Sequence, residues 1–212
     1  MKKILSLVLV VLTATTLNAQ KIEIAAKGGV FFGGNANFAY ANIKFNTAGT
    51  WGVDLSLKSK AGYVGISWSQ AITQGQINDW YGGNYTSYNF DADLHYILGT
   101  YRPTFVKESL EGFLTVQLGA VGAFLTDLVD GGRYQNWMFA GAIGGGGSYF
   151  FGSGRIGLRI EGRLLLPMSF AGVSFGCGVG TGGASCGTGL SGYAAIAQGD
   201  ITGGLVIRLG QL

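Results

Sequence analysis

The clearest shortage in this sequence is of charge. Asp, Glu, Lys and Arg make up 12% of the 212 residues, about half the share of roughly 25% found in ordinary soluble domains. So few charges exclude a disordered polyelectrolyte, and they would leave a soluble globule with too little polar surface. A membrane protein needs far less charge, so the composition points first to that class.

Proline is also nearly absent, with two residues, whereas glycine is abundant, with 39. Each glycine in a helix interior costs about 1 kcal/mol relative to alanine, so a mostly helical protein is disfavoured. The glycines follow no strict three-residue period, which excludes collagen. The length suits one β domain or at most two small ones.

Long apolar runs are missing after residue 19, where no segment has the ~20 apolar residues that a spanning helix needs. Residues 1–19 are typical of a secretory signal peptide: Lys2 and Lys3 precede an apolar stretch from Ile4 to Leu12, with cleavage expected after Ala19. We therefore expect an exported chain with one domain over residues 20–212. Loss of the two lysines leaves 12 basic and 11 acidic residues, so no nucleic-acid partner is expected.

Cysteine occurs twice, as Cys177 and Cys186. An even count in an exported protein favours a disulfide, and the glycine-rich segment between the two residues can close a small loop. A metal site would need further ligands, and no histidine lies nearby. We predict a structural disulfide, no metal site and no cofactor.

Alternation of apolar and polar residues is the dominant pattern, and it predicts β-strands. It is clearest from Ile156 to Leu166, which Pro167 ends, and from Tyr88 to Leu98. Each run approaches the ~9–11 residues of a tilted membrane strand. Six further strands are expected at 22–27, 53–57, 64–69, 114–120, 138–151 and 201–209.

The connections between these strands alternate in length. Short or medium turns are expected at 58–61, 101–111 and 152–154, and long loops at 33–49, 70–87, 126–137 and 168–198. Outer-membrane barrels have short periplasmic turns, longer external loops and an even number of strands. We therefore predict an all-β, eight-stranded antiparallel up-and-down transmembrane barrel. A ten-stranded barrel, using Phe38 to Phe45 and part of the last loop, is the alternative.

The polar faces of the strands are expected to point inward. A soluble barrel would reverse the faces, but its exterior would then depend on very few charges. An eight-stranded barrel is just wide enough for side chains to fill, so nearly balanced charges should pair and close the lumen. The predicted lumen network comprises Glu23, Lys27, Asp54, Asp91, Asp93, His95, Arg159, Glu161, Arg163 and Arg208.

Other charges and aromatics are expected at the ends of the strands. Charges gather at the predicted periplasmic turns, namely Lys58, Lys60, Arg102, Lys107, Glu108, Glu111 and Arg155. Two aromatic girdles are expected, as in outer-membrane barrels. They comprise Tyr63, Tyr101, Phe113 and Phe151 on one side, and Trp68, Tyr88, Phe124 and Trp137 on the other.

Taken together, the leader, the alternating segment Arg155–Pro167, the glycine-rich sixth strand and the final segment Gly203–Leu209 resemble small porin-like outer-membrane β-barrel proteins of Gram-negative bacteria. This resemblance covers the whole mature chain. It implies contact with outer-membrane lipid and insertion by the outer-membrane assembly machinery. That machinery commonly reads a terminal aromatic, and here the sequence ends Leu209-Gly-Gln-Leu212.

No residue pattern indicates catalysis. His95 is the only histidine, with Asp93 two residues away, but no recognisable serine motif accompanies it. The external-loop aromatics Trp80, Tyr81 and Tyr85 are candidate contact residues. We expect a non-enzymatic structural or interaction role, through external loops or as a subunit of an envelope complex with a protein partner. A narrow diffusion channel for small solutes or apolar molecules is the alternative, and a lipid-modifying enzyme is a third hypothesis.

Overall fold

The computed structural model describes residues 21–37, 41–79, 86–107, 109–127, 131–152, 154–168, 176–180, 183–187 and 197–209. The expected signal peptide, residues 1–19, lies outside these ranges, as do Trp80, Tyr81 and Tyr85, so these assignments stay predictions. Within the described ranges, no helix has the length and apolar character needed to cross a membrane.

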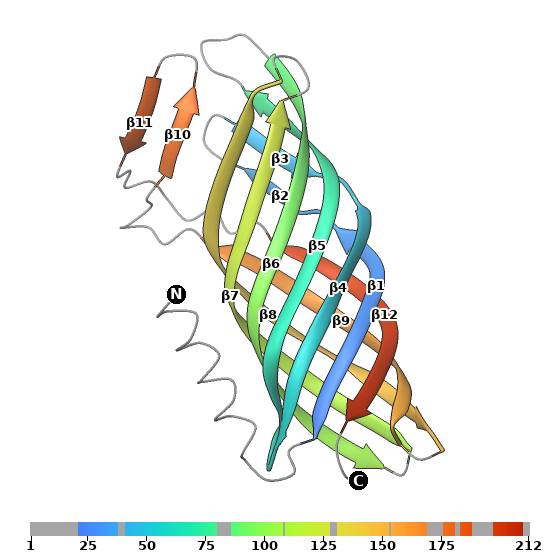
Figure 1. Cartoon of the computed structure of the whole chain (residues 1–212). Helices are drawn as coiled ribbons and strands as arrows, with labels where there is room; N and C mark the ends of the chain where they lie inside the picture. The colour runs from blue at the N-terminus through green and yellow to red at the C-terminus, as the bar shows by residue number, and fades with distance from the viewer. Residues whose placement is uncertain are drawn as a thin grey trace, which may run out of the picture.

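Eight antiparallel strands close into a barrel, as Figure 1 shows. Each strand pairs with the next around the barrel, and the last pairs with the first. The predicted eight-stranded fold is therefore confirmed. In order around the barrel, the strands are β1 (Ile22–Phe32), β4 (Ala48–Ser59), β5 (Gly62–Asp79), β6 (Thr86–Lys107), β7 (Leu110–Asp127), β8 (Arg133–Phe151), β9 (Ile156–Met168) and β12 (Gln198–Leu209).

The barrel wall is tall on one side and low on the other. Strands β5 to β8 have 18, 22, 18 and 19 residues, whereas β1, β4, β9 and β12 have 11 to 13. A tilted strand needs only about 9–11 residues to cross a bilayer, so β5 to β8 continue well beyond it. The long loop expected at 70–87 is therefore mostly strand, as is the turn expected at 101–111.

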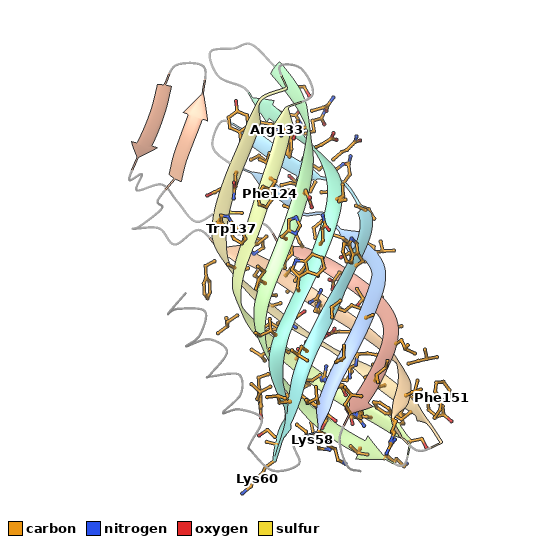
Figure 2. All side chains as sticks on the ribbon, in the orientation of Figure 1. Lys58, Lys60, Phe124, Arg133, Trp137 and Phe151 are labelled. Carbon is orange, nitrogen blue, oxygen red and sulfur yellow. The ribbon has the colours of Figure 1, made fainter. Side chains whose placement is uncertain are left out.

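The two ends of the barrel differ in their connections. The short hairpin connections lie at one end, here called the turn end, together with Ile22 and Leu209; the tall wall rises at the other, the loop end (Figure 1). Lys58, Lys60 and Phe151 mark the turn end, and Arg133 marks the loop end (Figure 2). Gly152 and Gly154, with φ of 43° and 71°, form the turn between β8 and β9, where a side chain would be strained.

Two further short strands lie above β4, on its loop-end side, and are not additional strands of the closed barrel wall. β2 (Asn35–Asn37) pairs with β3 (Ala41–Phe45), and β3 pairs with Gly75 to Asp79 of β5. The pairing of β4 with β5 covers only Gly62 to Ala71, nearer the turn end. The ten-stranded alternative was right that this segment is a strand but wrong about its place in the wall.

The predicted disulfide falls on a separate hairpin. β10 (Gly176–Gly180) and β11 (Gly183–Gly187) form a two-stranded sheet of their own, in which Cys177 and Cys186 are direct cross-strand partners. The side chains of this hairpin lie outside the described part of the structure. The disulfide therefore stays a prediction, made on two residues that share one register position.

Inward-facing glycines let neighbouring strands curve tightly around the lumen. A Cβ added at Gly204 would lie 2.1 Å from the Ala26 carbonyl oxygen, and one at Gly146 would lie 2.0 Å from that of Ile160. The outward-facing Gly203, by contrast, has no atom nearer than 3.8 Å to such a Cβ. Part of the high glycine content thus reflects the small radius of the barrel.

Candidate functional site

The lower half of the barrel, toward the turn end, is apolar outside and polar inside. Its outward side chains are exposed aliphatic residues, which matches the apolar band of a membrane barrel. Thirteen of them, from six strands, are Val53, Leu55, Val64, Ile66, Leu114, Val116, Leu118, Ile143, Leu158, Ile160, Leu164, Ile201 and Leu205. This band faces lipid and leaves the polar side chains of the same strands inside.

Nearest the turn end, a buried cluster of charges is built around Glu23 of β1. Its carboxylate accepts hydrogen bonds from Arg102 of β6, from Arg159 Nη2 of β9 at 2.6 Å, and from Arg208 Nε of β12 at 3.1 Å. Arg208 Nη2 also donates to Glu111 Oε2 of β7 at 2.7 Å. These five side chains, which we call the lower cluster, join five strands across the lumen.

Aromatic rings pack against the guanidinium groups of the lower cluster. Arg208 lies 3.6 Å from the ring centre of Phe150, and Arg102 lies 4.9 Å from that of Tyr63. Phe113 receives both Arg102 and Arg159, at 5.3 and 5.2 Å. Cation–π contacts strengthen when water is excluded, so these rings fill space and stabilise the buried charge together.

A second cluster, the upper cluster, lies in the next layer of the lumen. Lys27 Nζ lies 2.8 Å from Asp54 Oδ1 and 3.4 Å from Glu161 Oε2. Arg163 pairs with Asp200 through Nη2, which also donates to Ser69 Oγ at 3.3 Å, while Arg163 Nη1 donates to Gln117 Oε1 at 3.2 Å. Together the ion pairs of the two clusters involve five bases and five acids: Arg102, Arg159, Arg208, Lys27 and Arg163 with Glu23, Glu111, Asp54, Glu161 and Asp200.

Above the two clusters, toward the loop end, the polarity of the barrel reverses. A hydrogen bond from Tyr96 to Gln198 crosses the lumen, and beyond it the interior is an apolar cluster that includes Phe90, Ala92 and Leu94 of β6. The exposed fractions of these three side chains are 6%, 1% and 3%. The lumen is therefore filled at successive levels, first by paired charges and then by hydrocarbon.

This reversal places three predicted lumen residues on the outside. Asp91, Asp93 and His95 lie on the outer face of β6, while Phe90, Ala92, Leu94 and Tyr96 point inward and are buried. The structure here differs from the prediction that the polar face of every strand points inward. β6 extends past the lipid, so its polar face meets water and its apolar face forms a core.

The sequence prediction missed three lumen residues because it made their strands too short. Arg102 and Glu111 were predicted to lie in a periplasmic turn, and Asp200 just before the start of the last strand, yet the exposed fractions of the three residues are 2%, 1% and 2%. Each continues the parity of inward residues on its own strand: Arg102 follows Leu98 and Thr100, and Glu111 precedes Phe113. Extending the alternation by one to four positions would have found them.

The residues predicted to form the two aromatic girdles are also divided between the outer and inner faces of the barrel. Tyr101 and Phe151 point outward near the turn end, whereas Tyr63 and Phe113 point inward to the lower cluster. At the other boundary Trp68, Phe124 and Trp137 lie on the outer surface in one row of aromatic contacts. The side chain of Tyr88 lies outside the described part of the structure.

A closed antiparallel barrel with an apolar outer band and a polar lower interior has the architecture of a small outer-membrane β-barrel. Comparison with solved structures agrees. The chain is similar to Neisserial surface protein A, with a TM-score of 0.52 and 9% identity over 89% of this chain and 97% of that one. It is also similar to the outer-membrane protease OmpT of Escherichia coli, with a TM-score of 0.51 and 10% identity over 92% and 98%.

These similarities concern the fold. No family model matches the chain, and no curated protein matches it. In the described ranges, no group of three or more His, Cys, Asp or Glu side chains is placed to hold a metal ion.

Proposed function

We propose that this protein is an exported outer-membrane barrel with a closed lumen, which acts without catalysis by presenting its loop end to a partner in the envelope or outside the cell. The observation that carries the proposal is the filling of the lumen at successive levels. In the lower cluster, the Glu23 side chain is 1% exposed and touches three arginines from three other strands.

The same filling argues against a water-filled pore. Removing a partner from a buried ion pair leaves an uncompensated charge, which costs about 3–5 kcal/mol. An ion crossing this lumen would have to separate such pairs and then pass the apolar cluster around Phe90 and Leu94. The tall wall, by contrast, offers surface on β5 to β8 beyond the bilayer for a partner to contact.

Planar-bilayer recording tests the closed lumen. The folded full-length protein should insert without producing single-channel steps. The variant Arg159→Ala should introduce intermittent conductance, because Arg159 bridges Glu23 and Ser148 across the lumen. Reproducible steps in the wild type that change in Arg159→Ala would contradict the proposal. Mild detergent extraction from native membranes should, in addition, recover a stoichiometric protein partner.

A second candidate function is a pathway for small apolar molecules. It is favoured by the partly buried apolar residues that pack against the loop-end core, namely Ile43, Phe45, Ile77, Leu125 and Met138. Vesicles that contain the protein would then take up an apolar fluorescent probe faster than empty vesicles. Uptake equal to that of empty vesicles favours the closed barrel.

A further inference from the structure

A row of aromatic rings crosses the outer surface of five neighbouring strands. Trp51 of β4 contacts Trp68 of β5 with ring centres 4.6 Å apart, and Trp68 stacks with His95 of β6 at 6.1 Å. His95 meets Phe124 of β7 at 5.4 Å, and Phe124 meets Trp137 of β8 at 6.2 Å. Figure 2 shows Phe124 and Trp137 on the tall side of the barrel. We call these five residues the ring row.

The ring row coincides with the edge of the lipid-facing band. On the outer face of β6, Ile97 and Tyr101 lie on the turn-end side of His95 and are exposed and apolar, whereas Asp93 and Asp91 lie on its loop-end side. Aromatic side chains collect at the interfaces of membrane barrels. The outer surface therefore passes from hydrocarbon to headgroups at this row.

Directly above the ring row, amide and carboxylate side chains form a polar ladder between β5 and β6. Gln70 Nε2 donates to both carboxylate oxygens of Asp93, at 2.7 and 2.9 Å, and His95 Nε2 lies 3.2 Å from Asp93 Oδ2. Gln74 Nε2 donates to Asp91 Oδ1 at 3.1 Å. Gln76 Nε2 then donates to Ser87 Oγ at 2.9 Å.

The carboxylates of this ladder are held in place yet still accessible. The Asp93 side chain is 36% exposed and that of His95 is 26% exposed, while Trp51 and Trp137 are about half exposed, at 51% and 49%. A carboxylate fixed by neighbours retains lone pairs for outside donors and makes strong charge-assisted hydrogen bonds. The surface thus offers aromatic faces and ordered acceptors side by side.

The charge of the ladder selects its partner. Asp91 and Asp93 would repel a phosphate or another anionic headgroup placed against them. A sugar suits both parts of the surface, because its C–H face packs on an aromatic ring while its hydroxyl or ammonium groups donate to carboxylates. The ladder also runs away from the lipid boundary along β5 and β6, as a sugar chain attached to a lipid would.

We propose that the outer face of β5 and β6, at and above the ring row, binds the oligosaccharide of an outer-leaflet glycolipid, with a sugar ring against Trp68 and sugar hydroxyl groups on Asp93 and Asp91. This site lies on the outside of the barrel and does not depend on whether the lumen is closed. It gives the barrel a specific contact with the sugar layer above the lipid.

The test compares bilayer nanodiscs that hold the folded full-length protein. Phosphatidylcholine discs are titrated with a neutral glycosyl diacylglycerol in one arm and with phosphatidylglycerol, which is anionic and lacks sugar, in the other. Tryptophan fluorescence and native mass spectrometry report association. The glycolipid should associate at least tenfold more tightly than phosphatidylglycerol. Equal association of the two lipids would overturn the proposal.

Variants assign the effect to the site. Trp68→Leu and the double variant Asp91→Ala/Asp93→Ala should each weaken association of the neutral glycolipid about tenfold, through lost ring and charge-assisted contacts. Tyr101→Leu, an exposed aromatic on the same strand near the turn end, should stay within about twofold of the wild type and serves as the matched control. Circular dichroism confirms that each variant is folded. Folded variants that bind as tightly as the wild type would overturn the proposal.

Discussion

Arg163 on β9 and Asp200 on β12 are direct cross-strand partners and form an ion pair inside the barrel. Their side chains are 0% and 1% exposed. Both charges are buried too deeply for water to solvate one of them if the other is removed. The pair joins β9 to β12, two of the four shorter strands of the barrel wall.

The first prediction concerns this ion pair. Arg163→Ala should lower the free energy of unfolding by about 3–5 kcal/mol, because Asp200 would be left buried and unpaired. Urea unfolding in lipid vesicles measures the change. The double variant Arg163→Met/Asp200→Leu removes both charges and should recover most of the lost stability. A double variant no more stable than Arg163→Ala would show that the cost is not one of uncompensated charge.

A second prediction tests where the lipid-facing band ends. Leu118→Arg on β7 should destabilise the inserted barrel by about 2–4 kcal/mol, since the side chain, 58% exposed, lies within the apolar band. Ile72→Arg on β5 is the matched control. Ile72 is 63% exposed but lies beyond the ring row, so its replacement should cost about 0–1 kcal/mol. Equal costs in vesicle unfolding would contradict the proposed boundary.

A third prediction uses two adjacent glycines that face opposite ways. A methyl group at Gly204 would lie 2.1 Å from the Ala26 carbonyl oxygen, whereas one at Gly203 has no neighbour nearer than 3.8 Å. Gly204→Ala should therefore destabilise the barrel by about 1–3 kcal/mol or more, as overpacking does. Gly203→Ala should fold with nearly wild-type stability. The paired unfolding curves decide, and indistinguishable curves would contradict this account of the inward glycines.

The fourth prediction is the Cys177–Cys186 disulfide. The two residues share one register position of the β10–β11 hairpin, as a cross-strand disulfide requires. Mass spectrometry of the mature protein without reductant should find both thiols oxidised and joined in one peptide after digestion. Reduction should leave the unfolding of the barrel almost unchanged, because the hairpin forms its own sheet. Two free thiols in protein from an oxidising compartment would refute the disulfide.

Much of the fold could be predicted because alternation is a local property. Residues Ile156 to Leu166 show two faces in the sequence alone, and β9 runs from Ile156 to Met168. Glycine and turn patterns also placed the β8–β9 connection correctly. The ends of β5, β6 and β7 were misplaced because polar residues such as Gln74 and Ser87 were interpreted as loop, although they continue strands above the lipid.

The candidate site was harder to predict because its partners come from distant parts of the chain. Glu23 meets Arg102, Arg159 and Arg208, which are 79, 136 and 185 residues away. Alternation places each of these residues on a face of its own strand. It carries no information on which strands lie opposite one another across the lumen, and that depends on closure of the barrel.

The sequence by itself determined the class of protein: scarce charge, abundant glycine and period-two alternation are compatible with strands in lipid and with little else. Only the tertiary structure decided which face meets which solvent. Asp93 and Asp200 are both acidic residues on alternating strands, yet one lies outside and the other lies inside. The difference arises because β6 rises beyond the bilayer, where water favours a polar exterior, whereas Asp200 lies at a level where only Arg163 and its neighbours can stabilise its charge.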